Sequence, residues 1–165
     1  MTNNKTINTE DMNFNLSTQL LEDLSIWLFL QNKQAQDGFH LYSGISPELL
    51  PEELHKRLYS EIGATPEHFG EVIFHDAVGN IPIHDDSDFK ESINSKYTVL
   101  IPIKIINQHV YTSDDLMLHS TFIHSLNNKF NFSELEVGEC YEFDPTKEHG
   151  VMTNCRIMML AFWVK

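Results

Sequence analysis

The sequence predicts an α+β domain whose main body is a two-sheet β-barrel. Helical periodicity is confined to about the first third of the chain, and segments with the period of a strand follow it from about residue 69 onward. Two of these later segments, 97–106 and 156–164, are almost entirely apolar on both parities, which is typical of strands covered on both faces. Helices that precede a run of short strands favour this architecture over an alternating α/β fold.

Composition limits the number of domains and the classes of partner. A chain of 165 residues fits a single domain with one core, and we expect residues 1–15 to form a flexible lead-in and residues 16–165 to form that domain. The formal net charge of −13 disfavours binding to nucleic acid and to anionic membranes.

The sequence also predicts a compartment. The two cysteines, Cys140 and Cys155, are too few for a disulfide framework. The N-terminus is polar, and the apolar run 26–30 is far too short to span a bilayer. These features predict a soluble, cytoplasmic protein.

Two helices are expected before the strands. Residues 16–33 place leucines and a tryptophan on one stripe at helical spacing, and either Ser17 or Asn15 can cap this helix. A Ser-Pro-Glu sequence at 46–48 predicts a second helix start, with an N-cap, a proline and an acid in the first turn. We expect this helical region to end at Gly63.

Strand periodicity predicts the remaining elements. The strongest signal is 97–106, in which Pro102 lacks a donor for the ladder and therefore predicts either an edge position or a bulge. Polar loops are expected at 87–96, over the mouth of a pocket, and at 130–136, whereas 114–128 fits either a helix or a loop followed by a strand. The other expected strands are 71–75, 81–86, 108–112, 140–143, 148–152 and 155–164, and the last two are expected to form a hairpin around Thr153-Asn154.

Three residues form a candidate metal-binding set. His84 and Asp86 lie two residues apart in an expected strand, so that an imidazole and a carboxylate would point to the same face. His149 adds a second imidazole at the start of the expected hairpin. Two imidazoles and one carboxylate form a facial set for Fe(II) that leaves three coordination positions open. The spacing alone is a weak signal and favours a polar loop with unrelated side chains, because nine histidines make chance pairings common.

Arg156 is the one charged residue of the last expected strand. In the expected hairpin it lies roughly across from His149, and paired residues of antiparallel neighbours share a face. A guanidinium on an apolar strand needs an anionic partner. Two partners meet this need: a bound carboxylate held in bidentate fashion, and a salt bridge to Glu148 or Asp144.

A resemblance to the Fe(II)/2-oxoglutarate-dependent dioxygenases is carried by the blocks IPIHDD, YTVLIPIKI and VGECYEFDPTKEHGVMTNCRIMMLAFW. The segment from Phe143 to Arg156 is most similar to the aspartyl/asparaginyl β-hydroxylase branch of that superfamily. The resemblance covers about residues 70–164. It implies a double-stranded β-helix, or cupin-like jelly roll, with the N-terminal helices packed on one sheet.

The resemblance also implies a role for each candidate residue. Fe(II) would be bound by His84, Asp86 and His149, which would form the catalytic centre. The cosubstrate 2-oxoglutarate would chelate the metal.

The far carboxylate of the cosubstrate would then be bound by Arg156. Thr98 and Tyr97, on the strand after the His-x-Asp sequence, are the candidates for a further contact with 2-oxoglutarate. Lys104 has the same parity as Thr98 and is the alternative to Arg156 as the anchor for the carboxylate.

The activity implied is the hydroxylation by O2 of a C–H bond in a small molecule or an amino-acid side chain, with decarboxylation of 2-oxoglutarate to succinate. Two other classes of protein fit the same residues. A cupin-like metal enzyme that does not use 2-oxoglutarate predicts that Arg156→Ala leaves metal binding and activity intact. A non-catalytic jelly-roll binding protein predicts that the purified protein contains no metal.

Overall fold

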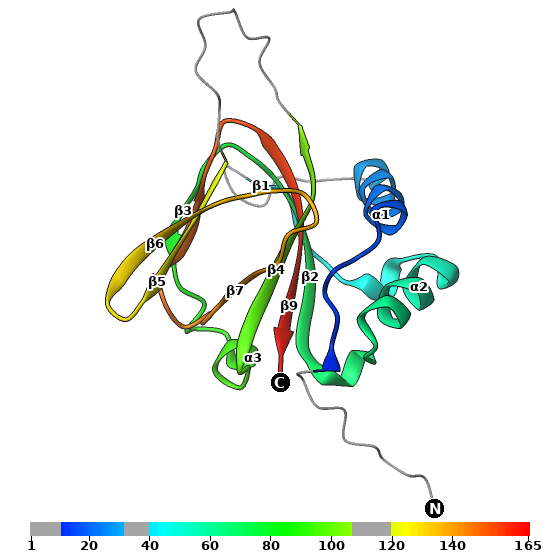
Figure 1. Cartoon of the computed structure of the whole chain (residues 1–165), viewed down its shortest axis with the longest axis horizontal. Helices are drawn as coiled ribbons and strands as arrows, with labels where there is room; N and C mark the ends of the chain where they lie inside the picture. The colour runs from blue at the N-terminus through cyan, green and yellow to red at the C-terminus, as the bar shows by residue number, and fades with distance from the viewer. Residues whose placement is uncertain (1–10, 32–39, 107–119) are drawn as a thin grey trace, which may run out of the picture.

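The computed structural model describes residues 11–31, 40–106 and 120–165, which form two antiparallel sheets and a helical layer (Figure 1). In chain order the elements are α1 (Thr18–Leu30), β1 (His40–Ile45), η2 (Pro47–Leu49), α2 (Glu52–Ile62), η3 (Pro66–His68), β2 (Phe69–Val78), β3 (Ile81–His84), α3 (Lys90–Ile93), β4 (Tyr97–Ile106), β5 (Thr121–Leu126), β6 (Lys129–Glu134), β7 (Tyr141–Phe143), β8 (His149–Met152) and β9 (Arg156–Val164).

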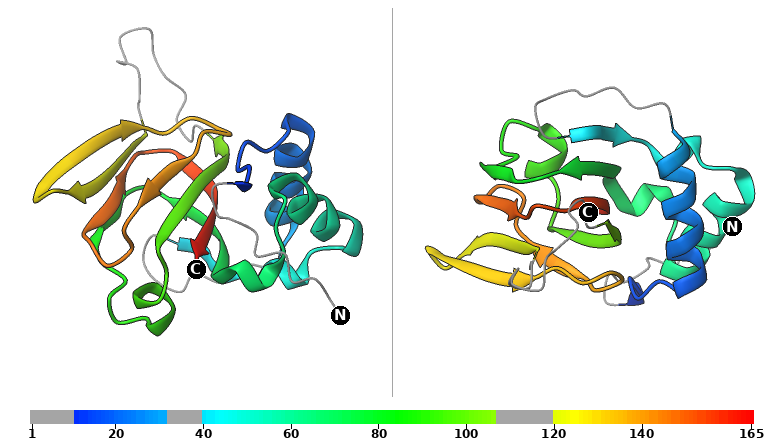
Figure 2. Two further views of the ribbon diagram at one scale, coloured as in Figure 1. Left: turned by 60° about the horizontal axis from the view of Figure 1, so that its bottom comes forward. Right: turned by 90° about the horizontal axis from the view of Figure 1, so that it is seen from above.

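The strands form a double-stranded β-helix, which confirms the predicted fold. One sheet has five strands in the order β1-β2-β9-β4-β7, and the other has four strands in the order β3-β8-β5-β6. The two sheets face each other, and α1 and α2 cover the outer side of the five-stranded sheet (Figures 1 and 2). No helix among the described residues is long and apolar enough to cross a membrane.

Strand β9 lies between β2 and β4 and separates two hydrophobic cores. One parity of β9, including Leu160 and Phe162, packs with the leucines of α1 and α2 in the core beneath the helices. The other parity, including Ile157 and Met159, packs with residues of both sheets in the interior of the barrel. The prediction that this strand is covered on both faces is confirmed, and we call these two sides the helix face and the barrel face.

The first helix begins and packs as its sequence predicts. The Ser17 side chain caps α1 by accepting a hydrogen bond from the backbone N–H of Leu20, at 3.3 Å. Leu20, Leu24 and Leu28 are completely buried and form the predicted stripe against the sheet. The second helix ends at Gly63, whose φ of 74° is the left-handed conformation that glycine adopts readily.

The packed part of the chain begins earlier than Leu16. The Phe14 ring is buried in the core beneath the helices, with its centroid 5.4 Å from that of Phe162. The backbone N–H of Asn13 donates to the carbonyl of Ile62 at 2.9 Å. The prediction that residues up to 15 form a flexible lead-in is therefore wrong for 13–15, because an aromatic side chain there fills space between α2 and the sheet.

Residues 129–134, which lie largely in the segment predicted to be a loop, form strand β6. Strands β5 and β6 pair in register from Thr121 opposite Glu134 to Leu126 opposite Lys129. The two residues between them, Asn127 and Asn128, both have positive φ, as a type I′ hairpin turn requires. The ambiguous segment 114–128 thus contains a strand at 121–126, whereas residues 114–119 and the expected strand 108–112 lie outside the described residues.

The expected hairpin of the last two strands is wrong. Strand β8 belongs to the four-stranded sheet, where it pairs with β3 and β5, and β9 belongs to the other sheet. The corner between them is held by Thr153, whose backbone N–H donates to the Asn80 side chain at 2.7 Å. The Thr153 hydroxyl is 2.7 Å from that of Ser120. The chain therefore crosses between sheets, and His149 does not pair with Arg156.

Pro102 marks a bulge, one of its two predicted outcomes. It pairs with Met159 of β9, but Lys104 pairs with Met158, so that β4 contains one residue more than β9 at this point. The additional residue reverses the parity of the strand. As a result, Lys104 is on the helix face, where its Nζ lies 3.5 Å from a carboxylate oxygen of Glu22 in α1.

Arg156 forms an ion pair on the helix face, with a residue that the sequence did not predict. Its Nε and one terminal nitrogen donate to the two carboxylate oxygens of Asp76, at 2.9 and 2.7 Å. Its guanidinium also lies 5.1 Å from the centre of the Phe29 ring. Hydrogen bonding to the carboxylate raises the pKa of Arg156, so the side chain is charged. Asp76 is therefore the anionic partner of Arg156. The partners expected from the sequence were a bound carboxylate and a salt bridge to Glu148 or Asp144.

Because the Asp76 side chain is completely buried, and that of Arg156 is only 17% exposed, we expect neither charge to be tolerated without the other. The substitution Arg156→Ala should lower the free energy of unfolding by about 3–5 kcal/mol, since it leaves a buried carboxylate without its partner. The double replacement Asp76→Leu/Arg156→Met should cost much less, because it removes both charges. Urea unfolding followed by circular dichroism measures both variants. Equal losses in the two would contradict the explanation.

Candidate metal centre

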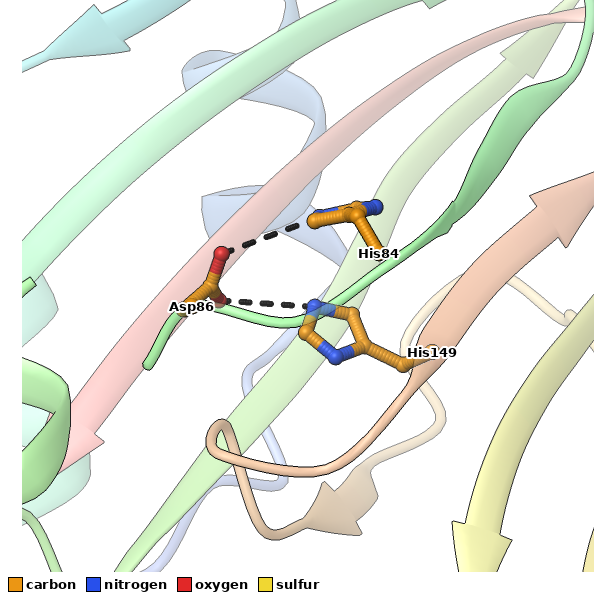
Figure 3. Close-up of side chains that lie close together, drawn as sticks. All are labelled: His84, Asp86 and His149. Atoms are coloured by element: carbon orange, nitrogen blue, oxygen red, sulfur yellow. Dashed lines mark ion pairs between the residues drawn. The ribbon is translucent and has the colours of Figure 1, made fainter. Parts of the chain in front are cut away.

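Three side chains from separate positions in the chain converge at one end of the barrel (Figure 3). His84, Asp86 and His149 each offer a ligand atom, and these atoms all lie within 4.8 Å of one another. The Asp86 carboxylate lies between the two rings, with one oxygen 3.7 Å from Nε2 of His84 and the other 3.4 Å from Nε2 of His149. The structure thus brings together the three residues that the sequence predicted as ligands.

The two histidines are neighbours across a strand pair. His84 ends β3 and His149 begins β8, and the two residues are opposite each other in the register of the four-stranded sheet. Their ring centroids are 4.5 Å apart. Paired positions on adjacent antiparallel strands share a face, which explains why both rings face the same carboxylate.

A bulge turns His84 toward the centre. Ile81 pairs with Val151 and His84 with His149, so that two residues of β3, Pro82 and Ile83, lie opposite a single residue of β8. In a regular strand His84 would face away from Ile81, which is buried on the barrel face. The additional residue in β3 places both on that face.

Gly150, the residue opposite the bulge, makes it possible. A Cβ atom at position 150 would lie 2.8 Å from the carbonyl oxygen of Ile81 and 3.2 Å from the backbone nitrogen of Ile83. Both are backbone atoms, so a side chain at this position would push β3 away from β8. The lack of a side chain at 150 is therefore a condition for the position of His84.

Asp86 reaches the centre from the loop after β3. Its backbone N–H donates to the carbonyl of Pro145 at 2.9 Å, which ties this loop to the one that precedes β8. The neighbouring Asp85 is engaged elsewhere, since it accepts hydrogen bonds from the hydroxyl and the backbone N–H of Ser87. These bonds lower the pKa of Asp85. Asp86 is thus the carboxylate that faces the imidazoles.

Both imidazoles are oriented for metal binding by backbone carbonyls. Nδ1 of His84 is 2.7 Å from the carbonyl oxygen of Pro82, and Nδ1 of His149 is 2.8 Å from that of Lys147. A carbonyl can only accept, so each Nδ1 carries the proton when the ring is neutral. Each Nε2 then directs its lone pair toward Asp86. Histidines that bind metals are commonly held in this way.

The centre is open on one side. The side chain of His149 is 8% exposed and that of Asp86 is 15% exposed, whereas that of His84 is 44% exposed. On the inner side, the centroid of the Phe143 ring lies 4.6 Å from that of the His149 ring. Of the three side chains, that of His84 is therefore the most accessible to solvent, and that of His149 packs against an aromatic ring.

The sequence did not single out His124, which also faces the barrel interior. His124 of β5 is opposite His149 of β8 in the register, so a row of three imidazoles crosses the sheet from His84 to His149 to His124. Its ring stacks on that of Phe122, with centroids 5.3 Å apart. Burial, followed by the charge of His149, lowers the pKa of His124. Recognition of the Asn-Asn turn after 126 could have revealed this strand, and with it the face of His124.

The predicted contacts to a cosubstrate lie on two different faces. Thr98 is completely buried on the barrel face, opposite Phe143 in the register of β4 and β7. Tyr97 packs against the core beneath the helices, on the same side as Lys104 and Arg156.

Arg156 is also at the far end of its strand from the metal centre. Thr98 pairs with Trp163 of β9. Arg156 and Trp163 are seven residues apart in β9, which corresponds to about 23 Å along the strand. The predictions that Arg156 or Lys104 lies beside the metal are therefore wrong. The register shift in β4 and the crossing from β8 to β9 explain why.

Comparison with solved structures finds this fold in known oxygenases. HygX from Streptomyces hygroscopicus, solved with nickel and 2-oxoglutarate bound, is 10% identical, with a TM-score of 0.58, over 93% of this chain and 82% of that one. A prolyl-4-hydroxylase from Pseudomonas putida is 13% identical, with a TM-score of 0.52, over 92% and 89% of the two chains. A 2OG-Fe(II) oxygenase family oxidoreductase from Burkholderia pseudomallei is 11% identical, with a TM-score of 0.52, over 87% and 77%. At these identities the comparison shows a shared fold.

No protein-family model matches the chain, and no curated protein matches it in sequence. The likeness to the oxygenases is therefore one of structure, and the roles of residues have to come from the geometry of this chain.

The bulge opposite Gly150 yields a test of how the centre is positioned. The substitution Gly150→Ala should weaken the binding of Fe(II) by roughly 10- to 100-fold, because the displaced β3 carries His84 away from the other two ligands. Anaerobic calorimetric titration with Fe(II) measures the affinity. Ile83→Ala alters the exposed side of the same bulge without adding an atom and should bind Fe(II) like the wild type. Equal affinities for all three proteins would contradict the role of Gly150.

Proposed function

We propose that the protein is an Fe(II)- and 2-oxoglutarate-dependent oxygenase, a hydroxylase whose metal ligands are His84, Asp86 and His149. The observation that carries this proposal is the convergence of these three side chains, with both imidazoles held through Nδ1 so that Nε2 faces the carboxylate. Two imidazoles and one carboxylate on one side of an ion are the ligand set of non-haem Fe(II) oxygenases.

The residues present fit an iron ion. The donor atoms are two imidazole nitrogens and one carboxylate, and the backbone carbonyls of Pro82 and Lys147 fix the proton position on each neutral ring. The exposed edge of His84 leaves one side of the set accessible to further ligands. With Fe(II) and 2-oxoglutarate bound, such a centre couples the decarboxylation of 2-oxoglutarate to succinate with the hydroxylation of a C–H bond by O2.

The part that the chain itself plays follows from where its side chains lie. His149 and Asp86 are largely buried and fix the inner half of the centre, whereas His84 borders solvent. Phe143 and Phe122, with ring centroids 5.1 Å apart, line the barrel beneath the centre and keep that side apolar.

The substrate we propose is a small molecule or an amino-acid side chain that reaches the centre past His84. The loop after Asp86 carries Phe89, which is half exposed and whose ring centroid lies 6.0 Å from that of Trp163. An exposed aromatic ring three residues after Asp86 suits contact with an apolar part of a substrate.

The oxygenase fold supports this class of function, and the sequence around His149 supports the aspartyl/asparaginyl β-hydroxylase branch within it. We also propose a cytoplasmic location, because Cys140 and Cys155 are both free thiols.

One observation favours a second candidate, a cupin-like metal enzyme that does not use 2-oxoglutarate. Lys104 and Arg156, the basic residues within β4 and β9, both point to the helix face and have carboxylate partners there. An acid bound at the metal would therefore find no guanidinium or ammonium from these two residues.

Anaerobic titration separates these functions. We expect the purified protein to bind one Fe(II), and addition of 2-oxoglutarate to give a weak visible charge-transfer band. In air the loaded protein should convert 2-oxoglutarate to succinate. His84→Ala and Asp86→Ala should lose both the band and succinate formation, because each removes a ligand of the metal.

The matched control is His55→Ala, which changes a histidine of α2 whose ring centroid lies 4.8 Å from that of Tyr59, outside the centre. It should keep metal binding and turnover. Tight Fe(II) binding without any response to 2-oxoglutarate would favour the cupin-like enzyme, and lack of Fe(II) binding would reject both.

A further inference from the structure

Two polar atoms are buried without a hydrogen-bond partner in the described part of the chain: the hydroxyl oxygen of Thr98 and Nδ1 of His124. Thr98 is completely buried. Buried polar atoms of native proteins are nearly always paired, and an unpaired one costs free energy comparable to a lost hydrogen bond. Both atoms are therefore candidates to bind a group that comes from outside the chain.

Both side chains face the interior of the barrel. Thr98 is opposite Phe143 across β4 and β7, so the two side chains share the barrel face. His124 is two residues from Phe122, which is buried in the same interior, and its ring stacks on the Phe122 ring.

Both side chains also lie next to the metal centre. The Phe143 ring contacts the His149 ring on one side and the Phe122 ring on the other, with centroids 4.6 and 5.1 Å apart. Thr98 adjoins this aromatic cluster through Phe143, and His124 adjoins it through Phe122 and through its pairing with His149. A ligand that extends inward from the metal would pass between the sheets that carry the two unpaired atoms.

We propose that Thr98 and His124 bind the inner carboxylate of an oxo acid whose other end chelates the metal, in place of the cation that the sequence predicted. This inference rests on the proposed function and names the residues that would hold 2-oxoglutarate. A threonine hydroxyl and an imidazole N–H can each donate to a carboxylate oxygen. The site is thereby built from two hydrogen-bond donors, one from each sheet.

The position of the basic residues supports this arrangement. Arg156 is committed to Asp76 on the opposite face of the sheet, and Lys104 lies beside Glu22 of α1. Selection of a dicarboxylate over a monocarboxylate would therefore depend on hydrogen bonds from Thr98 and His124.

Calorimetric titration of the Fe(II)-loaded protein under anaerobic conditions tests this inference. The two probes are 2-oxoglutarate and 2-oxopentanoate, which has the same chain length but lacks the second carboxylate. Thr98→Val and His124→Phe keep the shape of each side chain and remove its donor. We expect each substitution to weaken the binding of 2-oxoglutarate about 10-fold or more. The affinity for 2-oxopentanoate should change less than about 2-fold.

Matched controls separate the site from general damage. Thr121→Val changes a threonine of β5 outside the barrel core, and Asp76→Leu/Arg156→Met removes the ion pair on the helix face. Both should retain wild-type affinity for 2-oxoglutarate, and all four variants should bind Fe(II) like the wild type.

The outcomes distinguish the inference from the proposed function. Full 2-oxoglutarate affinity in both Thr98→Val and His124→Phe would overturn the inference and leave the function standing. A selective loss of affinity for 2-oxoglutarate in the Asp76→Leu/Arg156→Met protein would also overturn the inference. It would indicate that the Arg156 guanidinium binds the carboxylate. Failure of the wild-type protein to bind 2-oxoglutarate at all would overturn the proposed function and the inference with it.

Discussion

The pairing of β3 with β8 is the constraint on which the metal centre depends. These two short strands belong to the four-stranded sheet, and their register places His84 opposite His149. That register is reached through the bulge opposite Gly150, where backbone atoms of β3 approach too closely for any side chain. The carboxylate of Asp86 is added from a loop that is tied to the turn before β8. The centre is therefore built from backbone contacts between two neighbouring segments, and the rest of the barrel supports them.

The sequence predicted well what depends on one residue type or one periodicity. The apolar segments 97–106 and 156–164 are central strands, and the stripe on α1 packs where its leucines indicate. The three candidate ligands could be predicted because imidazoles and a carboxylate are the side chains that bind Fe(II). The two-residue spacing of His84 and Asp86 was nevertheless an incomplete reason for their convergence. Strand β3 ends at His84, and the facing of His84 depends on a bulge that alternation alone does not reveal.

What the sequence could not predict is which strands pair. A hairpin from 148 to 164 was a reasonable expectation from two adjacent strand signals, yet β8 and β9 lie in different sheets. That single difference moves Arg156 from beside the metal to the opposite face of the barrel wall, where a buried aspartate neutralises it. Non-local pairing also explains why the sequence could not relate Thr98, an expected contact of the cosubstrate, to His124. Both face the same interior from different sheets, and no local pattern relates residue 98 to residue 124.

The bulge in β4 has a consequence for how a barrel of this kind acquires charge. Because β4 has one residue more than β9 between Pro102 and Lys104, the lysine stands outside the barrel wall. A one-residue insertion at the matching point of β9 would restore simple alternation and turn the same ammonium group inward. The electrostatic character of the cavity is thus governed by the relative lengths of two adjoining strands as well as by their amino acids. Closely related chains with identical basic residues could therefore differ in the sign of the molecules they admit.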